Sequence, residues 1–430
     1  MIWLRSIVFI LVAVCSSGAG PARHLTIAPE HESGIFAPGE PIRWRIQWQG
    51  EGAPSSVGYK ITKGGLTPGG EGTIDLVDGA AVVKSRLDAP GTLLLEVRAK
   101  EQRVVGGVVV APDAIKPSRE RPTDFDDFWA SKLREAREVA FNDVVLPLDS
   151  GKPGTAYWKI TLDNIRGSKT RGQLARPAEG ERFPALLIVQ WAGVYPLEKH
   201  WVIDRAAEGW LVLDISAHDL PIDEPESFYE QQRAGPLKDY WGIGNDDRET
   251  SYFLRMYLSC VRAADYLAKR PDWDGKTLVV MGGSQGGQQA LVTAALHPQI
   301  TAAIAGVPAG CDMRGPDAGR LGGWPQWHGR TTGKDPEKVR RASEYFDVVN
   351  FASRIPCPVL IGVGLVDEVC PPAGILAAAN QITSPKQVVI LPSAGHQNEN
   401  DSHRAYEKSC WEIWLPTLRQ GKPAPVQSTQ

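Results

Sequence analysis

Hydrophobic and polar residues follow two different patterns in the two parts of the chain. Up to about residue 111, short segments alternate apolar and polar side chains and are separated by clusters of Gly and Pro. Such alternation predicts β-strands with one buried face, because successive side chains of a strand point to opposite faces. The alternating segments are Ile42–Trp48, Val57–Thr62, Thr92–Arg98 and Val104–Val110.

These segments predict a small domain with two antiparallel sheets. Their spacing favours a β-sandwich of immunoglobulin-like type, which we place at residues 22–115. Side chains suited to catalysis do not cluster in this stretch of the sequence. The sequence leaves its role open between a packing or spacer domain and a carbohydrate-binding domain.

The second part of the chain carries near-continuous apolar runs that are separated by helical patterns. Runs of this kind are typical of parallel strands, whose two faces are both covered by helices. They predict a doubly wound, mostly parallel α/β domain over residues 118–420. The predicted strands are Pro184–Val189, Trp210–Ile215, Thr277–Met281, Ala302–Val307, Val359–Val363 and Gln387–Leu391, and the predicted helices are Phe125–Val139, Tyr252–Ala268 and Gly287–Leu296.

The first residues have the order of a secretory signal peptide. A short head that contains Arg5 precedes an apolar run from Ile7 to Cys15, and small residues follow from Ser16 to Gly20. The run is shorter than the roughly 20 residues that span a bilayer. We therefore predict a signal peptide over residues 1–21, a secreted or periplasmic protein and no stable membrane span. Lipidation at Cys15 is disfavoured, because Val14 is bulky for the preceding position.

Composition narrows the classes of partner. Lys and Arg total 47 and Asp and Glu total 50, for a formal net charge of -3 over 430 residues. A balance of this kind offers no electrostatic attraction for a nucleic acid.

Removal of Cys15 leaves five cysteines, an odd number, so at least one thiol stays unpaired or pairs between chains. Their spacing does not resemble a zinc site, and no metal is predicted.

The strongest chemical signal is the hexapeptide Gly282-Gly283-Ser284-Gln285-Gly286-Gly287. It directly follows a predicted strand and directly precedes a predicted helix. A serine at a sharp turn from strand to helix is the nucleophile elbow of the α/β-hydrolase fold, and the flanking glycines make room for the strained turn. The N-terminus of the following helix favours the negative charge that develops there. We therefore identify Ser284 as the candidate nucleophile.

A serine nucleophile needs a base and a carboxylate that orients the base. In α/β-hydrolases the order along the chain is Ser, Asp or Glu, His. Asp367 follows the predicted strand Val359–Val363, and His396 follows the strand that ends at Leu391. Both would lie at the carboxyl edge of the sheet. We predict Asp367 as the acid, with Glu368 as the alternative, and His396 as the general base.

The tetrahedral intermediate also needs two amide donors. The residue after the nucleophile supplies one, which is the N–H of Gln285. The loop after an early strand supplies the other. Here that loop is Trp191–Tyr195, and its glycine permits close backbone approach, so the second donor is expected in the Gly193 to Val194 region. The segment Pro221–Asn245, which carries several aromatic residues, is expected to line or cover the pocket.

At these residues the chain resembles the acetyl xylan esterase and cephalosporin C deacetylase family of α/β-hydrolases. The resemblance runs from about Arg121 to about Leu418. It rests on Arg121-Pro122-Thr123-Asp124-Phe125, the helix Tyr252–Leu267 with Arg255 and Arg262, the elbow with Gln285, Asp367 ahead of Cys370-Pro371-Pro372, and Gly395-His396. It implies the catalytic roles given above for Ser284, Asp367 and His396, and oxyanion donors at Gln285 and Val194.

Two features depart from the family pattern. The family has Arg-Gly-Gln in a loop where this chain has Ser216-Ala217-His218, while the literal Arg171-Gly172-Gln173 lies too early to be the same element. The family also tends to have Glu after the catalytic His, where this chain has Gln397. Both changes leave the triad intact.

These observations predict a secreted serine carboxylesterase that needs no cofactor. Residue chemistry reaches hydrolysis of an ester or amide, and the resemblance implies removal of acetyl groups from small-molecule or oligosaccharide esters such as acetylated xylan. The alternatives are a serine peptidase of the prolyl oligopeptidase type, a glucuronoyl esterase, which typically has Arg where this chain has Gln285, and a non-catalytic carbohydrate-binding protein of the envelope. The oligomeric state is left open.

Overall fold

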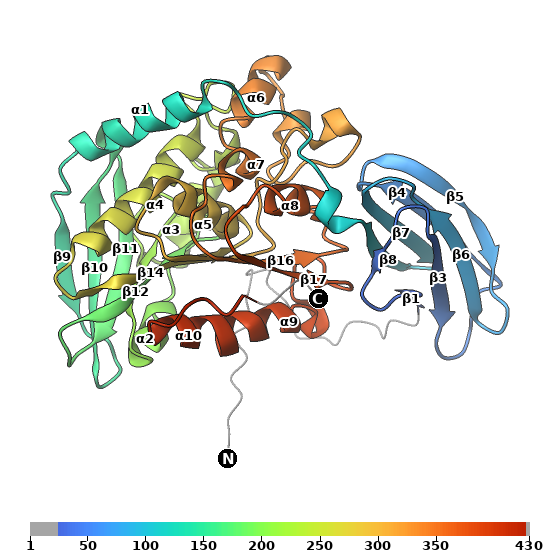
Figure 1. Ribbon diagram of the computed structural model, residues 1–430, viewed down its shortest axis with the longest axis horizontal. Helices are drawn as coiled ribbons and strands as arrows, with labels where there is room; N and C mark the ends of the chain where they lie inside the picture. Colours follow the sequence, from blue (N-terminus) through green and yellow to red (C-terminus); the bar gives the residue numbers. More distant parts are fainter. Residues whose placement is uncertain (1–24, 427–430) are drawn as a thin grey trace.

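The computed structural model describes residues 25–426, and every structural statement below refers to that part of the chain. The predicted signal peptide, residues 1–21, lies outside it. Among the described residues, none of the helices combines the length and the apolar composition that crossing a membrane requires. The chain forms an α/β unit with a smaller unit of two β-sheets beside it (Figure 1).

The α/β unit is built on one sheet with the strand order β17-β16-β15-β14-β12-β13-β11-β10-β9. The pairs from β13 to β17 are parallel, whereas β11, β10 and β9 are antiparallel additions at one edge. The strands are β9 (Val144–Leu148), β10 (Thr155–Asp163), β11 (Lys169–Pro177), β12 (Phe183–Val189), β13 (Leu211–Ile215), β14 (Trp273–Gly283), β15 (Ala302–Gly306), β16 (Val359–Gly364) and β17 (Lys386–Leu391). All six predicted buried strands are confirmed.

Helices cover both faces of this sheet, which explains why its parallel strands are mostly apolar (Figure 1). One face carries α1 (Phe125–Glu138), α4 (Tyr252–Lys269), α5 (Gln285–Leu296), α7 (Val348–Ala352) and α8 (Pro372–Ala379). The other face carries α2 (His200–Ala207), the π-helix η7 (Lys408–Trp414) and α10 (Leu415–Arg419). Shorter helices are α3 (Glu226–Ala234), α6 (Pro336–Ser343) and α9 (Arg404–Glu407). The predicted helices correspond to α1, α4 and α5.

The first described residues form two facing sheets. One has the order β1-β3-β6 and the other β2-β8-β7-β4-β5, and all their pairs are antiparallel except β2 with β8. Inward side chains from both sheets form one core, with Trp44 and Ile46 from one and Leu95 and Val97 from the other. The strands are β1 (Leu25–Pro29), β2 (Ile35–Phe36), β3 (Pro41–Trp48), β4 (Ser56–Lys63), β5 (Thr67–Asp75), β6 (Ala80–Arg86), β7 (Gly91–Ala99) and β8 (Gln102–Val110). The immunoglobulin-like character of this unit stays a prediction.

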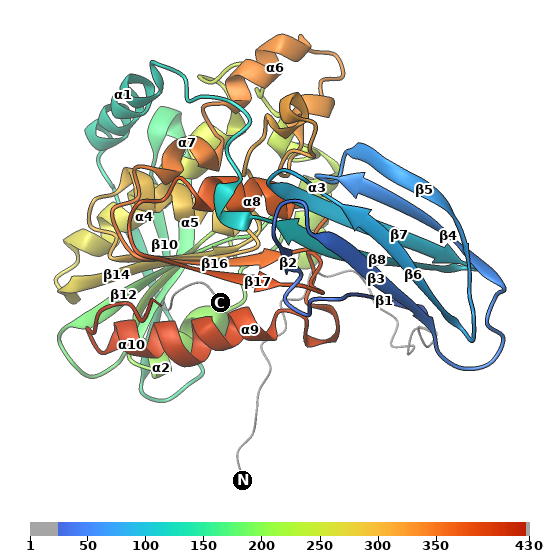
Figure 2. The ribbon, with the colours of Figure 1, turned by 45° about the vertical axis from the view of Figure 1, so that its right-hand side comes forward.

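The two-sheet unit lies against the β16 and α8 side of the α/β unit (Figure 2). Asn380, which follows α8, donates its side-chain amide to the carbonyl oxygens of Pro112 and Ile115. The N–H of Leu321 donates to the carbonyl of Gly64 at 2.8 Å. The smaller unit therefore contacts the edge of the sheet at which the loop after β16 begins.

Candidate active site

Ser284 stands at a strained turn between β14 and α5. Its backbone angles are φ 54° and ψ -121°, a conformation that L-residues rarely adopt. The neighbouring glycines permit it: a Cβ on Gly282 would lie 2.5 Å from the backbone of Gly286, and a Cβ on Gly286 would lie 2.4 Å from the carbonyl oxygen of Val189. The first N–H groups of α5 have no acceptor within the helix and lie next to the hydroxyl.

The structure brings Ser284, His396 and Asp367 into one hydrogen-bonded chain. The Ser284 hydroxyl lies 2.9 Å from Nε2 of His396, and Nδ1 of His396 lies 2.8 Å from Oδ2 of Asp367. The other carboxylate oxygen of Asp367 accepts the N–H groups of Val369 and Cys370, both at 2.8 Å. Asp367 is fully buried. These bonds fix the imidazole with Nδ1 as donor and Nε2 free to accept the serine proton.

Glu368, the alternative acid, points away from the imidazole. Its carboxylate accepts two hydrogen bonds from Arg103 of β8, at 2.8 and 3.0 Å, and its side chain is 48% exposed. Adjacent residues in this loop therefore face opposite sides, one the catalytic histidine and the other the two-sheet unit.

A cavity of about 290 Å³ opens onto Ser284 and His396. Aromatic side chains and several polar side chains from the segment after His396 are part of its lining. The aromatic residues are Trp191, Trp324, Tyr406 and Trp411, and the polar ones are Gln397, Asn398, His403 and Glu407. The cavity thus offers an apolar side and a hydrogen-bonding side to a bound molecule.

The loop after β12 lies beside the nucleophile. Trp191 and Ala192 line the cavity, whereas the Val194 side chain is buried in a cluster with Tyr229 and Tyr240. The N–H of Gly193 donates to the Tyr240 hydroxyl at 3.3 Å, and that hydroxyl donates to Oε1 of Gln285. Tyr240 therefore ties this loop to the residue after Ser284.

The segment Pro221–Asn245 does not line the cavity, so that part of the expectation is wrong, while a covering role stays a prediction. Its aromatic residues pack in one cluster with Val194 of the loop after β12. The segment therefore supports the loop beside the nucleophile. The aromatic residues are Phe228, Tyr229, Tyr240 and Trp241.

His218 is a contributor that the sequence patterns did not reveal. It occupies the loop after β13, where its Nε2 donates to the carbonyl of Gly193 at 2.8 Å and its Nδ1 accepts from the Tyr252 hydroxyl at 2.7 Å. Its ring meets Tyr240 edge-on, with centroids 4.6 Å apart. Burial lowers the pKa of His218 to about 3, so the ring is neutral. Its position after a strand at the carboxyl edge was the one available signal.

Arg171-Gly172-Gln173 lies within β11, the antiparallel neighbour of β13, and so is a different element from the loop after β13. Its side chains nevertheless reach that strand and loop. Nε of Arg171 donates to Asp219, and Nε2 of Gln173 donates to Asp214. The loop that carries His218 is therefore held partly from β11.

Cys370 lies near the triad. Its sulfur and the nearest ligand atoms of Asp367 and His396 are all within 4.8 Å of one another, a spacing that would suit a metal ion. The carboxylate and imidazole are already bonded to each other, and burial raises the pKa of the Cys370 thiol well above its usual value. A protonated thiol is a poor metal ligand, so this group does not fit a resident metal. All five described cysteines are buried, free thiols.

Comparison with known proteins agrees with this geometry. The acetyl xylan esterase (AXE1) family model matches residues 113–414. The acetyl esterase Axe7A of Xylanibacter ruminicola is 34% identical over 394 residues, which cover 89% of this chain and 88% of the relative. An acetyl xylan esterase from Paenibacillus sp. R4 superposes with a TM-score of 0.58 and 25% identity, over 69% of this chain and 96% of its own. Acetyl xylan esterase 1 from Thermoanaerobacterium sp. JW/SL YS485 superposes with a TM-score of 0.58 and 22% identity, over 69% of this chain and 96% of its own, and this likeness supports the fold.

Proposed function

The chain belongs to the acetyl xylan esterase (AXE1) family of carboxylic ester hydrolases of the serine hydrolase type, and from that premise we propose that it removes acetyl groups from carbohydrate esters such as acetylated xylan. The observation that carries the proposal is the hydrogen-bonded chain from Ser284 through His396 to Asp367. The cavity beside this chain of hydrogen bonds suits an ester of a short acyl group with a polar alcohol, because aromatic and hydrogen-bonding side chains both line it next to the nucleophile.

The reaction is acyl transfer to water. Nε2 of His396 takes the proton of the Ser284 hydroxyl while Oγ of Ser284 attacks the ester carbonyl. Asp367 stabilises the imidazolium that forms. The protonated His396 then gives this proton to the departing sugar oxygen. In the second half, His396 takes a proton from water, the hydroxide attacks the acyl-serine, and Ser284 regains its proton as acetate leaves.

Two backbone amides hold the oxyanion in this proposal. The first is the N–H of Gln285 at the start of α5, where the helix dipole adds to the effect. The second comes from the loop after β12 and is assigned to Val194. The N–H of Gly193 already has the Tyr240 hydroxyl as acceptor. Ala192, which lines the cavity, is the alternative donor in the same loop.

The arrangement of the whole chain is proposed as follows. Residues 1–21 are a signal peptide that directs the protein out of the cytoplasm, residues 22–115 are an immunoglobulin-like sandwich, and residues 118–420 are the catalytic domain. Lipidation at Cys15 is disfavoured on the sequence argument given above. The substrate is a small-molecule or oligosaccharide ester, and no metal or organic cofactor takes part.

Replacement of the nucleophile and the acid tests the proposal. Ser284→Ala should lower kcat on p-nitrophenyl acetate by on the order of 10⁴-fold or more, because the nucleophile is lost. Asp367→Asn should lower it by a comparable factor, because the imidazole loses the carboxylate that accepts its Nδ1 proton and fixes its tautomer. Glu368→Gln is the matched control and should lose less than about tenfold. Circular dichroism would verify folding.

The proposal fails if Ser284→Ala keeps near-normal turnover. It also fails if the wild-type protein ignores acetylated xylo-oligosaccharides and short acyl esters but cleaves peptides. Absence of reaction between Ser284 and a fluorophosphonate probe would indicate a silent site.

A further inference from the structure

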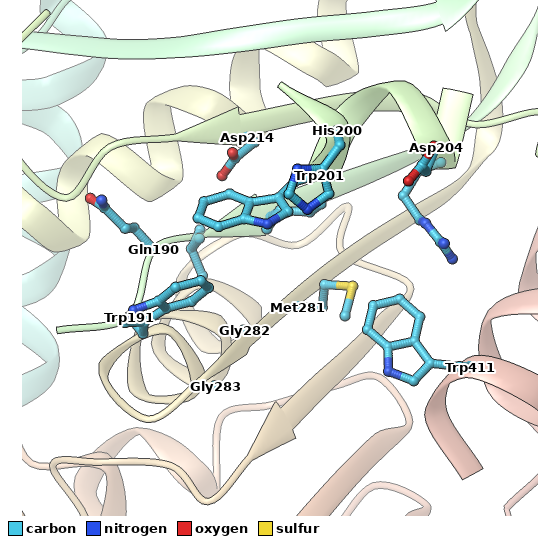
Figure 3. Close-up of a pocket in the computed structure, with 13 residues that line it drawn as sticks. Gln190, Trp191, His200, Trp201, Asp204, Asp214, Met281, Gly282, Gly283 and Trp411 are labelled. Carbon is cyan, nitrogen blue, oxygen red and sulfur yellow. The ribbon is translucent and has the colours of Figure 1, made fainter. Parts of the chain in front are cut away.

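A second pocket adjoins the catalytic cavity on the α2 and η7 side of the sheet. It has a volume of about 70 Å³ and lies at the carboxyl ends of β12 and β14 (Figure 3). Both hollows share Trp191, Met281 and Trp411, as well as Gly282 and Gly283, which directly precede Ser284. A molecule that fills this pocket would therefore lie next to an ester bound at the nucleophile.

Three indole rings surround the pocket. Trp191 comes from the loop after β12, Trp201 from α2 and Trp411 from η7 (Figure 3). The rings of Trp191 and Trp201 have centroids 4.8 Å apart and an interplanar angle of 57°. Polar side chains occupy part of the rim, with the Arg205 guanidinium 4.9 Å from the centre of the Trp411 ring. Flat apolar walls with a polar rim suit a ligand that has both C–H faces and hydroxyl groups.

Within the described part of the chain, one oxygen of a buried carboxyl group in the wall lacks a hydrogen-bond partner. Asp214 of β13 is fully buried, and its Oδ2 accepts from Nε2 of Gln173 at 2.9 Å. Its Oδ1 has no hydrogen-bond partner among residues 25–426. In Figure 3 this carboxyl group lies beside the ring of Trp201. Buried polar atoms are nearly always hydrogen-bonded, so this oxygen calls for a donor from the pocket side.

We propose that this pocket holds a sugar ring of the carbohydrate substrate, with one ring face against the indole of Trp201 and a hydroxyl group donating to Asp214. The inference rests on the function proposed above and extends it by assigning the residues that recognise the sugar. The acetyl group then occupies the neighbouring cavity at Ser284, and Trp191 and Met281, which line both hollows, contact both parts of the substrate.

A long acyl chain is the other possible occupant of an apolar hollow. It would cover Asp214 with hydrocarbon and leave the buried Oδ1 without a donor in the complex. A hydroxyl group supplies the donor, and burial raises the pKa of Asp214 to about 7, so the group can also donate when protonated. A sugar therefore fits this wall better than an acyl tail does.

Substrate discrimination tests the assignment. We compare kcat/KM on an acetylated xylo-oligosaccharide with kcat/KM on p-nitrophenyl acetate, which has no sugar. In Trp201→Ala and in Asp214→Asn, the ratio of the two should fall by about tenfold or more, mainly through KM, because the sugar contacts are lost. Trp48→Ala, in β3 of the two-sheet unit, is the matched control and should leave the ratio unchanged. Asp214→Asn conserves volume, which keeps the test valid if Trp201→Ala is unstable.

A binding measurement separates this inference from the function itself. Xylotriose is titrated into Ser284→Ala and into the double variants Ser284→Ala/Trp201→Ala and Ser284→Ala/Asp214→Asn, with calorimetric detection. Binding to the first and its loss in the double variants support the sugar pocket, even if the wild type fails to deacetylate xylan fragments. Absence of binding to Ser284→Ala, equal binding by all three, or an unchanged substrate ratio overturns the sugar pocket and leaves the esterase proposal standing. Faster hydrolysis of longer p-nitrophenyl acyl esters by Asp214→Asn, with no change on sugars, would identify an acyl pocket instead.

Discussion

At the scale of single residues, His218 shows how a buried side chain supports the site without touching the reacting atoms. It joins the carbonyl of Gly193 to the hydroxyl of Tyr252 and lies against Tyr240. The bond in which Nδ1 accepts from the Tyr252 hydroxyl requires the neutral ring, with Nε2 carrying the proton that is donated to Gly193. Protonation would place a second hydrogen opposite the Tyr252 hydroxyl and a charge in a buried position.

This requirement predicts a stability that depends on pH. Burial lowers the pKa of His218 from 6.5 to about 3, so the unfolded state binds a proton first as pH falls. The free energy of unfolding therefore decreases below about pH 6.5, and from about pH 7 to about pH 4.5 the loss from this residue amounts to roughly 2–3 kcal/mol.

Urea unfolding of the wild type and of His218→Gln across this range measures the effect. Glutamine cannot take up the proton, so the difference in stability between the two proteins should shrink as pH falls. The comparison with the variant is needed because carboxyl groups elsewhere in the protein titrate in the same pH range. A difference that stays constant with pH would show that His218 titrates normally.

At the scale of elements, the turn from β14 into α5 depends on close backbone contact. Gly286→Ala places a methyl group 2.4 Å from the carbonyl oxygen of Val189, so α5 must move away from β12. We expect a loss of about 1–3 kcal/mol in stability from this overpacking, and a fall in kcat because Ser284 moves with the helix. Thermal unfolding measures the loss of stability, and turnover of p-nitrophenyl acetate measures the fall in kcat.

Gly329→Ala is the control for this change, because a Cβ there meets nothing within 4 Å. It should leave both quantities close to those of the wild type. If Gly286→Ala behaves like Gly329→Ala, the helix does not depend on this contact.

The elements that the sequence predicted are those with a strong burial signal. The six parallel strands carry mostly apolar runs because helices cover both faces, and α4 and α5 carry helical periodicity. β5 went unpredicted because it is an edge strand that is almost wholly exposed and contains Pro68 and three glycines, so it has no alternation to detect. β9 and β10 also went unpredicted. The side chains of β9 are mostly exposed and those of β10 mostly half-buried, so neither strand has a clear burial signal in the sequence.

The residues of the candidate site also divide into those that the sequence could predict and those that it could not. Ser284, Asp367 and His396 could be named because each follows a predicted strand at one edge of the sheet, and the fold brings such positions together. His218, Tyr240 and Asp214 could not, because their roles depend on contacts with residues far away in the sequence that no local pattern encodes. The Val194 assignment rests on resemblance and on the position of the loop.

At the scale of the whole molecule, the two-sheet unit packs on the loop that presents Asp367. Arg103 holds Glu368, the next residue, and Gly107 of β8 lies so close to Leu365 that a Cβ would come within 2.1 Å of the Leu365 carbonyl oxygen. The N–H of Leu365 is bonded to the carbonyl of Leu391 at 3.0 Å. The loop with the acid is thus held between β17 and the smaller unit.

This contact predicts that a change in the two-sheet unit alters catalysis. Gly107→Ala must shift the Leu365 backbone or the smaller unit, and a displacement of Asp367 by about 1 Å would lower kcat by on the order of 10²-fold. Gly58→Ala, in the same sheet, meets nothing within 4 Å and is the control. Arg103→Gln removes two partly exposed ion pairs, with Glu368 and with Glu96, each worth about 1 kcal/mol at most, so it should fold normally and lower kcat less. Turnover of p-nitrophenyl acetate is measured well below each Tm, so that unfolding does not mimic lost catalysis. If Gly107→Ala folds and keeps the wild-type kcat, the acid loop holds its position without the two-sheet unit, and that unit serves something other than the triad.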